Sequence, residues 1–196
     1  MRYSKEHKAE TRQQILIQAA RHFLQDGIDG TGIAGLMAEA GLTHGGFYAH
    51  FKSKDDLVAA AIASGFRHTR AALAREAAKT GLEGVIRLYL DQRHRDTPSK
   101  GCIAALLSQE IARLPKKVRA SFTTEVAELL QLIAELLPMP EGRKRLTREE
   151  RSDRAIMILS SMMGSLQLAR AITDPALSDR ILACGIEAAL QLARHA

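Results

Sequence analysis

The chain has 196 residues, a formal net charge of +6 and a pI near 9.6, and only 4% of its residues are aromatic. This length supports a substantial core in one domain or two small ones, and the charge suits a polyanionic partner as well as it suits any protein rich in surface arginine. No apolar run approaches the roughly 18 residues of a membrane span and no signal-peptide core is present, so we expect a cytoplasmic protein with no membrane partner. Cys102 and Cys184 make neither a disulfide framework nor a metal cluster, and we expect no metal and no cofactor.

A first helix with one apolar face is predicted ahead of Gly27. Its apolar residues recur at i, i+1, i+4, i+5, i+8 and i+9, and they are Ile15, Leu16, Ala19, Ala20, Phe23 and Leu24. Gly27 is a typical residue for the end of such a helix. We expect this apolar face to pack behind the segment that follows it.

The segment 31–57 is predicted to form a helix-turn-helix and the start of a further helix. Three apolar residues with the i, i+3, i+4 spacing of one helix face come first, and they are Ile33, Leu36 and Met37. Gly41 then supplies a turn, and Thr43 can cap the helix after it. That helix has small and polar side chains on one side, while Phe47 and Phe51 anchor the other. Two short helices joined this tightly can place the second one in a DNA groove.

These residues carry a resemblance to a known family. The segment resembles the DNA-binding head of the tetracycline-repressor (TetR) family at twelve positions, which are Ala40, Gly41, Leu42, Thr43, Gly45, Phe47, Tyr48, Phe51, Lys52, Ser53, Lys54 and Leu57. The chain departs from the family pattern at Gly46 and His50 in the reading helix, which concerns the base sequence that is read and not the mode of binding. The resemblance in motif covers the first quarter to third of the chain and implies binding to double-stranded operator DNA.

Eight residues are candidates for contact with DNA. Those expected on the reading helix or beside it are Thr43, His44, Gly45, Gly46, Tyr48 and His50, and those expected outside it are Thr31 and Lys54. We expect Thr43, His44 and Gly45 to face the bases, and Tyr48, Lys54 and Thr31 to contact phosphates. A flexible helix end is the alternative explanation for the paired glycines.

The rest of the chain is predicted to be helical as well. A long fourth helix continues from Leu57 to about Leu73, a break follows at Gly81 and Gly84, and the segment 96–101 is expected to be a loop. Further helices are expected at 85–90, 102–114, 118–136, 147–173 and from 174 onward, the last two beginning at a capping box and at an Asp-Pro pair. The fold class is therefore all-α with about nine helices, in which a three-helix head (1–53) precedes a larger ligand-binding and dimerisation body (54–196).

The last two predicted helices have apolar faces that are too wide for burial on one side. Surplus apolar surface suggests a partner, and in the TetR family the last two helices pair with those of a second subunit. We therefore expect a homodimer whose interface includes Met162, Leu166, Ile181, Leu182, Ile186 and Ala189.

The leading functional hypothesis is a DNA-binding transcriptional regulator, more specifically a repressor that a small molecule or an electrophile releases from a near-palindromic operator. The resemblance implies an effector pocket in the body, and the candidate lining residues are Phe66, Tyr89, Cys102, Leu106, Phe122 and Met162, although each also fits plain core. The alternatives are a helical-bundle enzyme or cofactor-binding protein and an architectural DNA-binding protein. No convergent group of side chains supports catalysis, so we expect no enzyme activity.

Cys102 has two interpretations. If Ser99 caps the sixth helix, Cys102 lies in its first turn, where free backbone N–H groups and Lys100 favour a reactive thiolate. A single cysteine among apolar neighbours is otherwise a small buried hydrophobic residue. Both interpretations remain open at the level of sequence.

Overall fold

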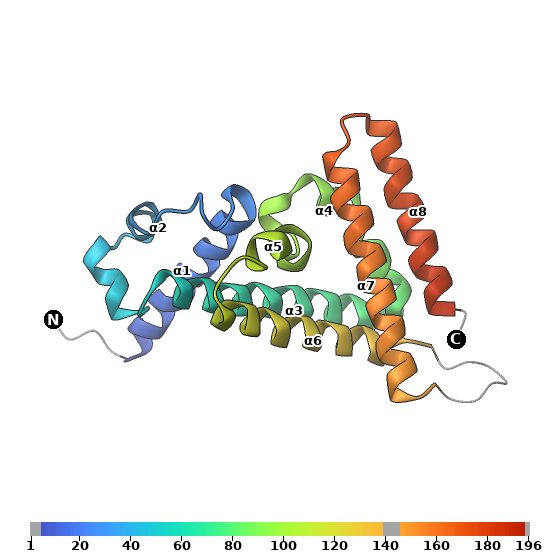
Figure 1. The fold of residues 1–196 in the computed structure, drawn as a ribbon, viewed down its shortest axis with the longest axis horizontal. Helices are drawn as coiled ribbons and strands as arrows, with labels where there is room; N and C mark the ends of the chain where they lie inside the picture. The colour runs from blue at the N-terminus through green and yellow to red at the C-terminus, as the bar shows by residue number, and fades with distance from the viewer. Residues whose placement is uncertain (1–4, 139–145, 195–196) are drawn as a thin grey trace.

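The computed structural model describes residues 5–138 and 146–194, which form eight α-helices and two 3-10 helices and contain no strand. The all-α class predicted from the sequence is therefore confirmed (Figure 1).

The N-terminal head consists of α1 (Lys5–Asp26), α2 (Ile33–Glu39) and the 3-10 helix η1 (His44–Ala49). The predicted apolar face of α1 is buried, as Ile15 and Phe23 show with at most 1% of their surface exposed. Gly27 follows the last residue of α1 with a φ of +78°, a conformation that an L side chain rarely adopts. The helix therefore ends where the sequence predicted.

Helix α3 (Lys54–Tyr89) connects the head to the body. It begins at the predicted cap, because the Asp56 amide donates to Ser53 Oγ at 3.2 Å. Figure 1 shows that α3 starts beside the head and runs the length of the molecule. The predicted break between the fourth and fifth helices is a kink inside this element at Gly81, with φ 65° and ψ −159°.

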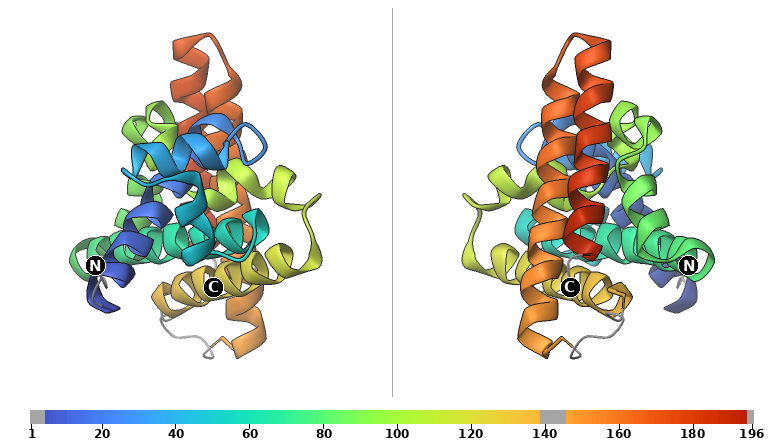
Figure 2. Two further views of the ribbon diagram at one scale, coloured as in Figure 1. Left: turned by 90° about the vertical axis from the view of Figure 1, so that its left-hand side faces the viewer. Right: turned by 90° about the vertical axis from the view of Figure 1, so that its right-hand side faces the viewer.

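The body is completed by α4 (Gln92–Asp96), η2 (Pro98–Lys100), α5 (Ile103–Ile111), α6 (Lys116–Leu136), α7 (Arg148–Ala171) and α8 (Pro175–Arg194). Helix α6 lies along α3, and α7 and α8 stand side by side at the end of the body away from the head (Figures 1 and 2). The predicted capping box at Thr147 and Glu150 is present, and the Asp174 carboxylate accepts from the Ala176 amide at 2.9 Å.

The segment 96–101 was expected to be a loop, and this was wrong. It contains the end of α4 and all of η2, because Pro98 at the first position of a short helix needs no N–H partner there. Ser99 consequently lies inside η2 and does not cap the next helix. Cys102 is itself the residue that precedes α5, and only 1% of it is exposed.

Head and body meet at the turn after α1. The Ile28 amide donates to Glu110 Oε2 of α5 at 2.7 Å, and Gln13 of α1 donates to Ser64 of α3 at 3.3 Å. A Cβ atom on Gly27 would stand 3.2 Å from the Glu110 carboxylate. Glycine at this position therefore lets the carboxylate approach the backbone of the head.

Two glycines test whether the kink in α3 depends on backbone conformation. No atom lies within 4 Å of a Cβ built on Gly81, so Gly81→Ala adds only the strain of a positive φ, and we expect the free energy of unfolding to fall by about 1–2 kcal/mol. Chemical denaturation measures this change. Gly35→Ala is the control, since Gly35 lies in α2 with equally open surroundings and an ordinary φ, and this variant is expected to gain about 0.5–1 kcal/mol. A Gly81→Ala variant as stable as the parent would contradict the kink.

Candidate nucleic-acid interface

The reading element of the head is η1. It is introduced by Gly41, which turns the chain with a φ of +70°, and by Thr43, whose Oγ1 accepts a hydrogen bond from the Gly46 amide at 3.3 Å. The sequence predicted an ordinary helix here, but the segment is a six-residue 3-10 helix. Two consecutive glycines, Gly45 and Gly46, cost roughly 1 kcal/mol each in an α-helix, which favours this shorter form.

Buried aromatic rings hold η1 against the head. Phe47 and Phe51 are each 1% exposed, and their ring centroids are 5.6 Å apart. The Tyr48 ring stands edge-on to Phe47 at 5.2 Å and to His44 at 6.4 Å. Because the phenylalanines anchor one side, the other side of η1 is presented to solvent, and 66% of Tyr48 is exposed.

The structure brings most of the predicted DNA contacts onto this exposed side. Thr43, His44 and Gly45 are exposed, Gly46 is half-buried, and Lys54 is partly exposed at the first position of α3. The Thr43 hydroxyl accepts from Gly46 and keeps its own hydrogen available for donation. The geometry therefore places one hydroxyl, one imidazole and one phenol in and beside η1, with the ammonium of Lys54 at the start of the next helix.

Two predicted contacts have other roles in this structure. Thr31 is 6% exposed and its hydroxyl donates to the Gly27 carbonyl at 2.9 Å, so its hydrogen is used within the turn. His50 is half-buried, and its pKa is lowered by burial and by the nearby charges of Lys8 and Arg12. The lowered pKa favours the neutral form of this imidazole.

Arg12 is not among the eight predicted DNA contacts, but it lies beside the reading element. Its guanidinium lies 4.9 Å from the centroid of the Phe51 ring, a cation–π arrangement that fixes a positive charge beside the reading element. The apolar spacing along α1 does not reveal this contact, because Phe51 is 39 positions further along the chain.

His22 forms ion pairs with two carboxylates of the head. Its Nε2 faces Glu39 Oε2 at 2.5 Å and its Nδ1 faces Asp26 Oδ2 at 3.2 Å. Two carboxylate acceptors need a donor on both ring nitrogens, which only the imidazolium provides. The Glu39 carboxylate, and after it the Asp26 carboxylate, accordingly raises the pKa of His22. This pair ties α1 to the end of α2.

The candidate effector-pocket residues lie in closed core. The rings of Phe66 and Phe122 meet edge to face at 5.7 Å, and Met162 has no exposed surface. None of the six predicted lining residues borders the hollows described below in the part of the chain that the structure covers. The pocket therefore stays a prediction.

Polar groups gather within this core around Cys102. The Cys102 amide donates to His94 Nε2 at 3.1 Å, and His94 Nδ1 donates to the Tyr89 carbonyl at 2.6 Å. Burial, and secondarily the neighbouring Cys102, raises the pKa of Tyr89 well above its ordinary value. Arg170 of α7 donates to the carbonyls of His94 and Arg95. The start of α5 is thus attached to α3, α4 and α7.

Most of the residues predicted to form the dimer interface do not lie on the outer surface of α7 and α8. Four of the six predicted residues, Met162, Leu166, Leu182 and Ala189, are at most 3% exposed and already belong to the core of one chain. Helices α7 and α8 have two adjacent apolar stripes, and most of the predicted interface residues belong to the stripe that faces the core. Ile186 is half-buried and lines a hollow with Arg87 and Leu90, away from the outer groove.

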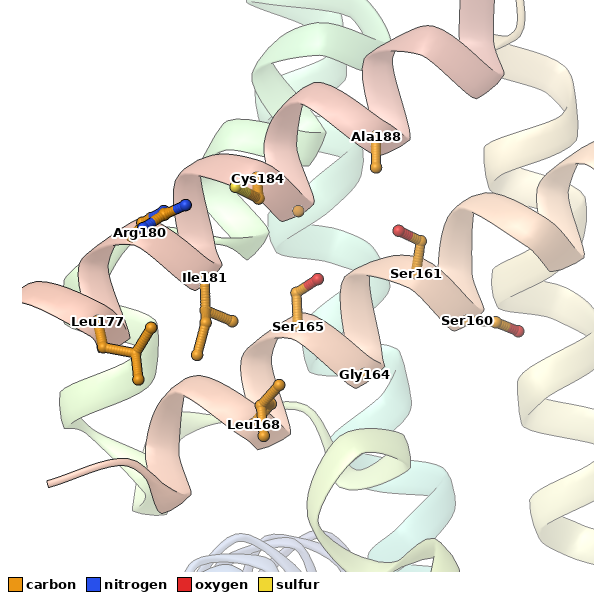
Figure 3. A pocket seen from close by; sticks show the side chains of 11 residues that line it. Ser160, Ser161, Gly164, Ser165, Leu168, Leu177, Arg180, Ile181, Cys184 and Ala188 are labelled. Carbon is orange, nitrogen blue, oxygen red and sulfur yellow. The ribbon is translucent and has the colours of Figure 1, made fainter. Parts of the chain in front are cut away.

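A groove of about 830 Å³ lies between α7 and α8 (Figure 3). Small residues form its floor, among them Ser161, Gly164, Ser165, Gly185 and Ala188. Leu168 and Leu177 stand at its rim, 53% and 43% exposed, and Ile181 points in between the helices. Of the predicted interface residues, Ile181 is the one that lines this groove.

Neither a metal-binding group nor a membrane-spanning helix occurs among the described residues. No group of three or more His, Cys, Asp or Glu side chains there is arranged to hold a metal ion. Within the same ranges, no helix combines the length and the apolar character that crossing a bilayer requires.

Comparison with known proteins agrees with this geometry. The family described as "Bacterial regulatory proteins, tetR family" matches residues 15–61. The HTH-type transcriptional regulator AcrR of Shigella flexneri is 45% identical over 56 residues, which are 29% of this chain and 26% of that relative. The sequence match therefore spans about a quarter of the curated relative and falls short of its body.

Solved structures match over nearly the whole chain. A TetR-family transcriptional regulator from Cytophaga hutchinsonii is similar with a TM-score of 0.76 at 18% identity, covering 97% of this chain and 98% of its own. A TetR regulator from Chloroflexus aurantiacus is similar with a TM-score of 0.71 at 25% identity, covering 96% and 94%. The shared fold includes the body that the sequence match does not reach.

The His22 ion pairs predict a pH dependence of stability. A histidine whose pKa is raised by folding stabilises the folded state fully below its unfolded pKa of 6.5, and that contribution is lost as pH rises through the folded pKa. We therefore expect the parent to lose stability between pH 6.0 and pH 8.5, and His22→Gln to lose less over the same range. Denaturant unfolding at the two pH values measures the difference.

His68→Gln is the matched control for this experiment. His68 is an exposed histidine of α3 that has no ion-pair partner among the described residues. Its variant is expected to keep the pH dependence of the parent. A His22→Gln variant with an unchanged pH profile would show that the ion pairs contribute nothing measurable.

Proposed function

We propose that this chain, a TetR/AcrR-type regulator by its N-terminal domain and its fold, is a ligand-responsive repressor that binds a near-palindromic operator as a homodimer. The observation that carries the proposal is the exposed side of η1, where Thr43, His44 and Tyr48 project from a backbone held by buried phenylalanines. A rigid element with polar groups on one side is what reading base edges requires.

A neutral or positive surface supports DNA as the partner of this face. Arg12 is fixed beside Phe51, and Lys54 begins α3 next to the reading element. Asp56, the nearby carboxylate with a pKa lowered by Lys117, is hydrogen-bonded to that lysine at 2.9 Å and is thereby compensated. Of the two carboxylates in the first turn of α3, Asp56 is therefore compensated by Lys117, while Asp55 has no ion-pair partner among the described residues.

The groove between α7 and α8 supports association of two copies. Its small-residue floor permits close approach, and its exposed leucines would be covered if the same groove of a second copy met it across a two-fold axis. Two heads related by that axis would face half-sites separated by one helical turn of DNA or a multiple of it.

Release by a small molecule is favoured over release by an electrophile. Cys102 is 1% exposed and lies behind Tyr89 and His94, so reagents in solution do not reach its sulfur in this conformation, whereas Cys184 is exposed in the α7–α8 groove. A low-pKa, accessible thiol is the usual requirement for a sensor cysteine, and Cys102 lacks the accessibility. No observation favours the alternative of a helical-bundle enzyme.

Selection of bound duplexes from random DNA, followed by binding measurements, tests the regulator proposal. Lys54→Ala should weaken binding to all sequences alike and reduce the dependence on salt by about one phosphate contact. His44→Ala should change which sequence is preferred, with a loss of about 1–3 kcal/mol at the affected base pair. Lys79→Ala is the matched control, because Lys79 is exposed on the same helix α3 but lies in the body.

Equal affinity of the parent for random and selected duplexes would remove the proposal of a sequence-selective regulator. A Lys79→Ala variant as impaired as Lys54→Ala would show that the lysines act only through overall charge.

The dimer proposal is tested by adding charge to the α7–α8 groove. Leu177→Arg places an arginine on a side chain that is exposed in one chain and covered in the proposed dimer, so sedimentation velocity should show a shift from dimer to monomer. Leu88→Arg is the control, since Leu88 is 40% exposed on α3 and lies outside the groove. If Leu177→Arg stays dimeric alongside a dimeric parent, the interface is elsewhere.

A further inference from the structure

A second hollow lies where the head meets the body. It has a volume of about 760 Å³ and is bordered by α1, by the first half of α3 and by η2 with the adjacent Gly101. Helix α1 contacts both α3 and η2, so this hollow is a cleft between parts of the head and parts of the body. Its size is in the range of clefts that hold small organic ligands.

Positive charge surrounds the cleft. Arg21 comes from α1, Arg67 from α3 and Lys100 from η2, and no carboxylate side chain is among the residues that border it. None of these three cations has an ion-pair partner among the residues that the structure describes. Three uncompensated cations around one cleft repel one another, and an anion between them relieves that repulsion.

Some cations of the body are paired with carboxylates. Arg70 is paired with Glu125 at 2.6 Å and with Glu128 at 2.5 Å, and Arg95 is paired with Asp179 at 2.6 Å. What distinguishes the cleft is that three cations and no carboxylate line the same hollow.

The cleft also has an apolar part. Ile17 is 51% exposed although it is a large aliphatic residue, and Ala20 and Leu24 follow it along the same side of α1. Gln13 and Ser64, which hydrogen-bond to each other at 3.3 Å, are also among the residues that line it. An exposed isoleucine beside uncompensated cations fits a ligand that is charged in one part and aliphatic in another.

We propose that this cleft binds an amphipathic carboxylate, an aliphatic chain that ends in a single anionic group. The carboxylate accepts hydrogen bonds from the guanidinium groups of Arg21 and Arg67, and the ammonium of Lys100 adds attraction. The aliphatic chain covers Ile17 and Leu24. Since the walls belong to α1 on one side and to η2 on the other, the bound ligand favours the head-to-body placement seen in this structure.

The proposed ligand differs from two simpler alternatives. Inorganic phosphate offers the charge but nothing to cover Ile17, and an aliphatic alcohol covers Ile17 but leaves the cations without an anion. The cleft is separate from the core around Phe66 and Phe122 where an effector pocket is predicted, because neither residue borders it.

Isothermal titration calorimetry with sodium octanoate, octan-1-ol and inorganic phosphate tests the proposal on the full chain. The parent should bind octanoate at one site, and the alcohol and phosphate at least about tenfold more weakly. The double variant Arg21→Gln/Arg67→Gln should lose at least about tenfold in octanoate affinity. Ile17→Ser should weaken octanoate binding by about threefold to tenfold, because it removes the aliphatic contact.

Arg75→Gln is the matched control, because Arg75 is an exposed arginine of α3 that does not border the cleft, and this variant should bind octanoate as the parent does. All the altered side chains are exposed, so without ligand the variants should have the same melting temperature as the parent. Octanoate should raise the melting temperature of the parent and leave that of the double variant unchanged.

Octanoate binding that is unchanged in the double variant, or octan-1-ol binding as tight as octanoate binding, would overturn the proposal. So would a loss of affinity in Arg75→Gln equal to that in the double variant. The titration uses the chain without DNA, so its outcome does not depend on the proposed operator binding.

Discussion

The hydrogen bond from the Ile28 amide to the Glu110 carboxylate ties the head to the body beside the packing of α1 on α3. It joins the turn after α1 to α5, 82 positions further along the chain. The turn admits the carboxylate because Gly27 has no Cβ and adopts a positive φ. The same turn leads into the helix-turn-helix, so this hydrogen bond links α5 to the start of the reading head.

Helix α5 is held at its other end by the polar group around His94. The Cys102 amide that precedes α5 donates to His94, and Arg170 of α7 donates to the carbonyls of His94 and Arg95. Burial lowers the pKa of His94, and the neutral ring can accept from Cys102 while donating to Tyr89. A continuous series of hydrogen-bonded contacts thus runs from α7 through His94 and α5 to the head. In a regulator of the proposed kind, the body could influence the head along these contacts.

The cleft between α1 and η2 is bordered by elements of the head and of the body. Arg21 and Arg67 line it, and both side chains are exposed, so water and salt screen the repulsion between them. The ligand proposed for the cleft would neutralise these cations and contact both parts of the chain.

Much of the local structure was determined by the sequence itself. Apolar spacing in α1, the glycines at 27 and 41, and the caps at Thr43, Ser53, Thr147 and Asp174 all act between residues close in sequence, so these elements could be predicted from their own segments. Only the tertiary structure decided which of two adjacent apolar stripes on α7 and α8 turns inward, because both stripes satisfy the helical period equally well. It likewise decided that His22 meets Glu39 and that Cys102 is covered, since both outcomes depend on partners brought close by packing of segments that are separated in the sequence.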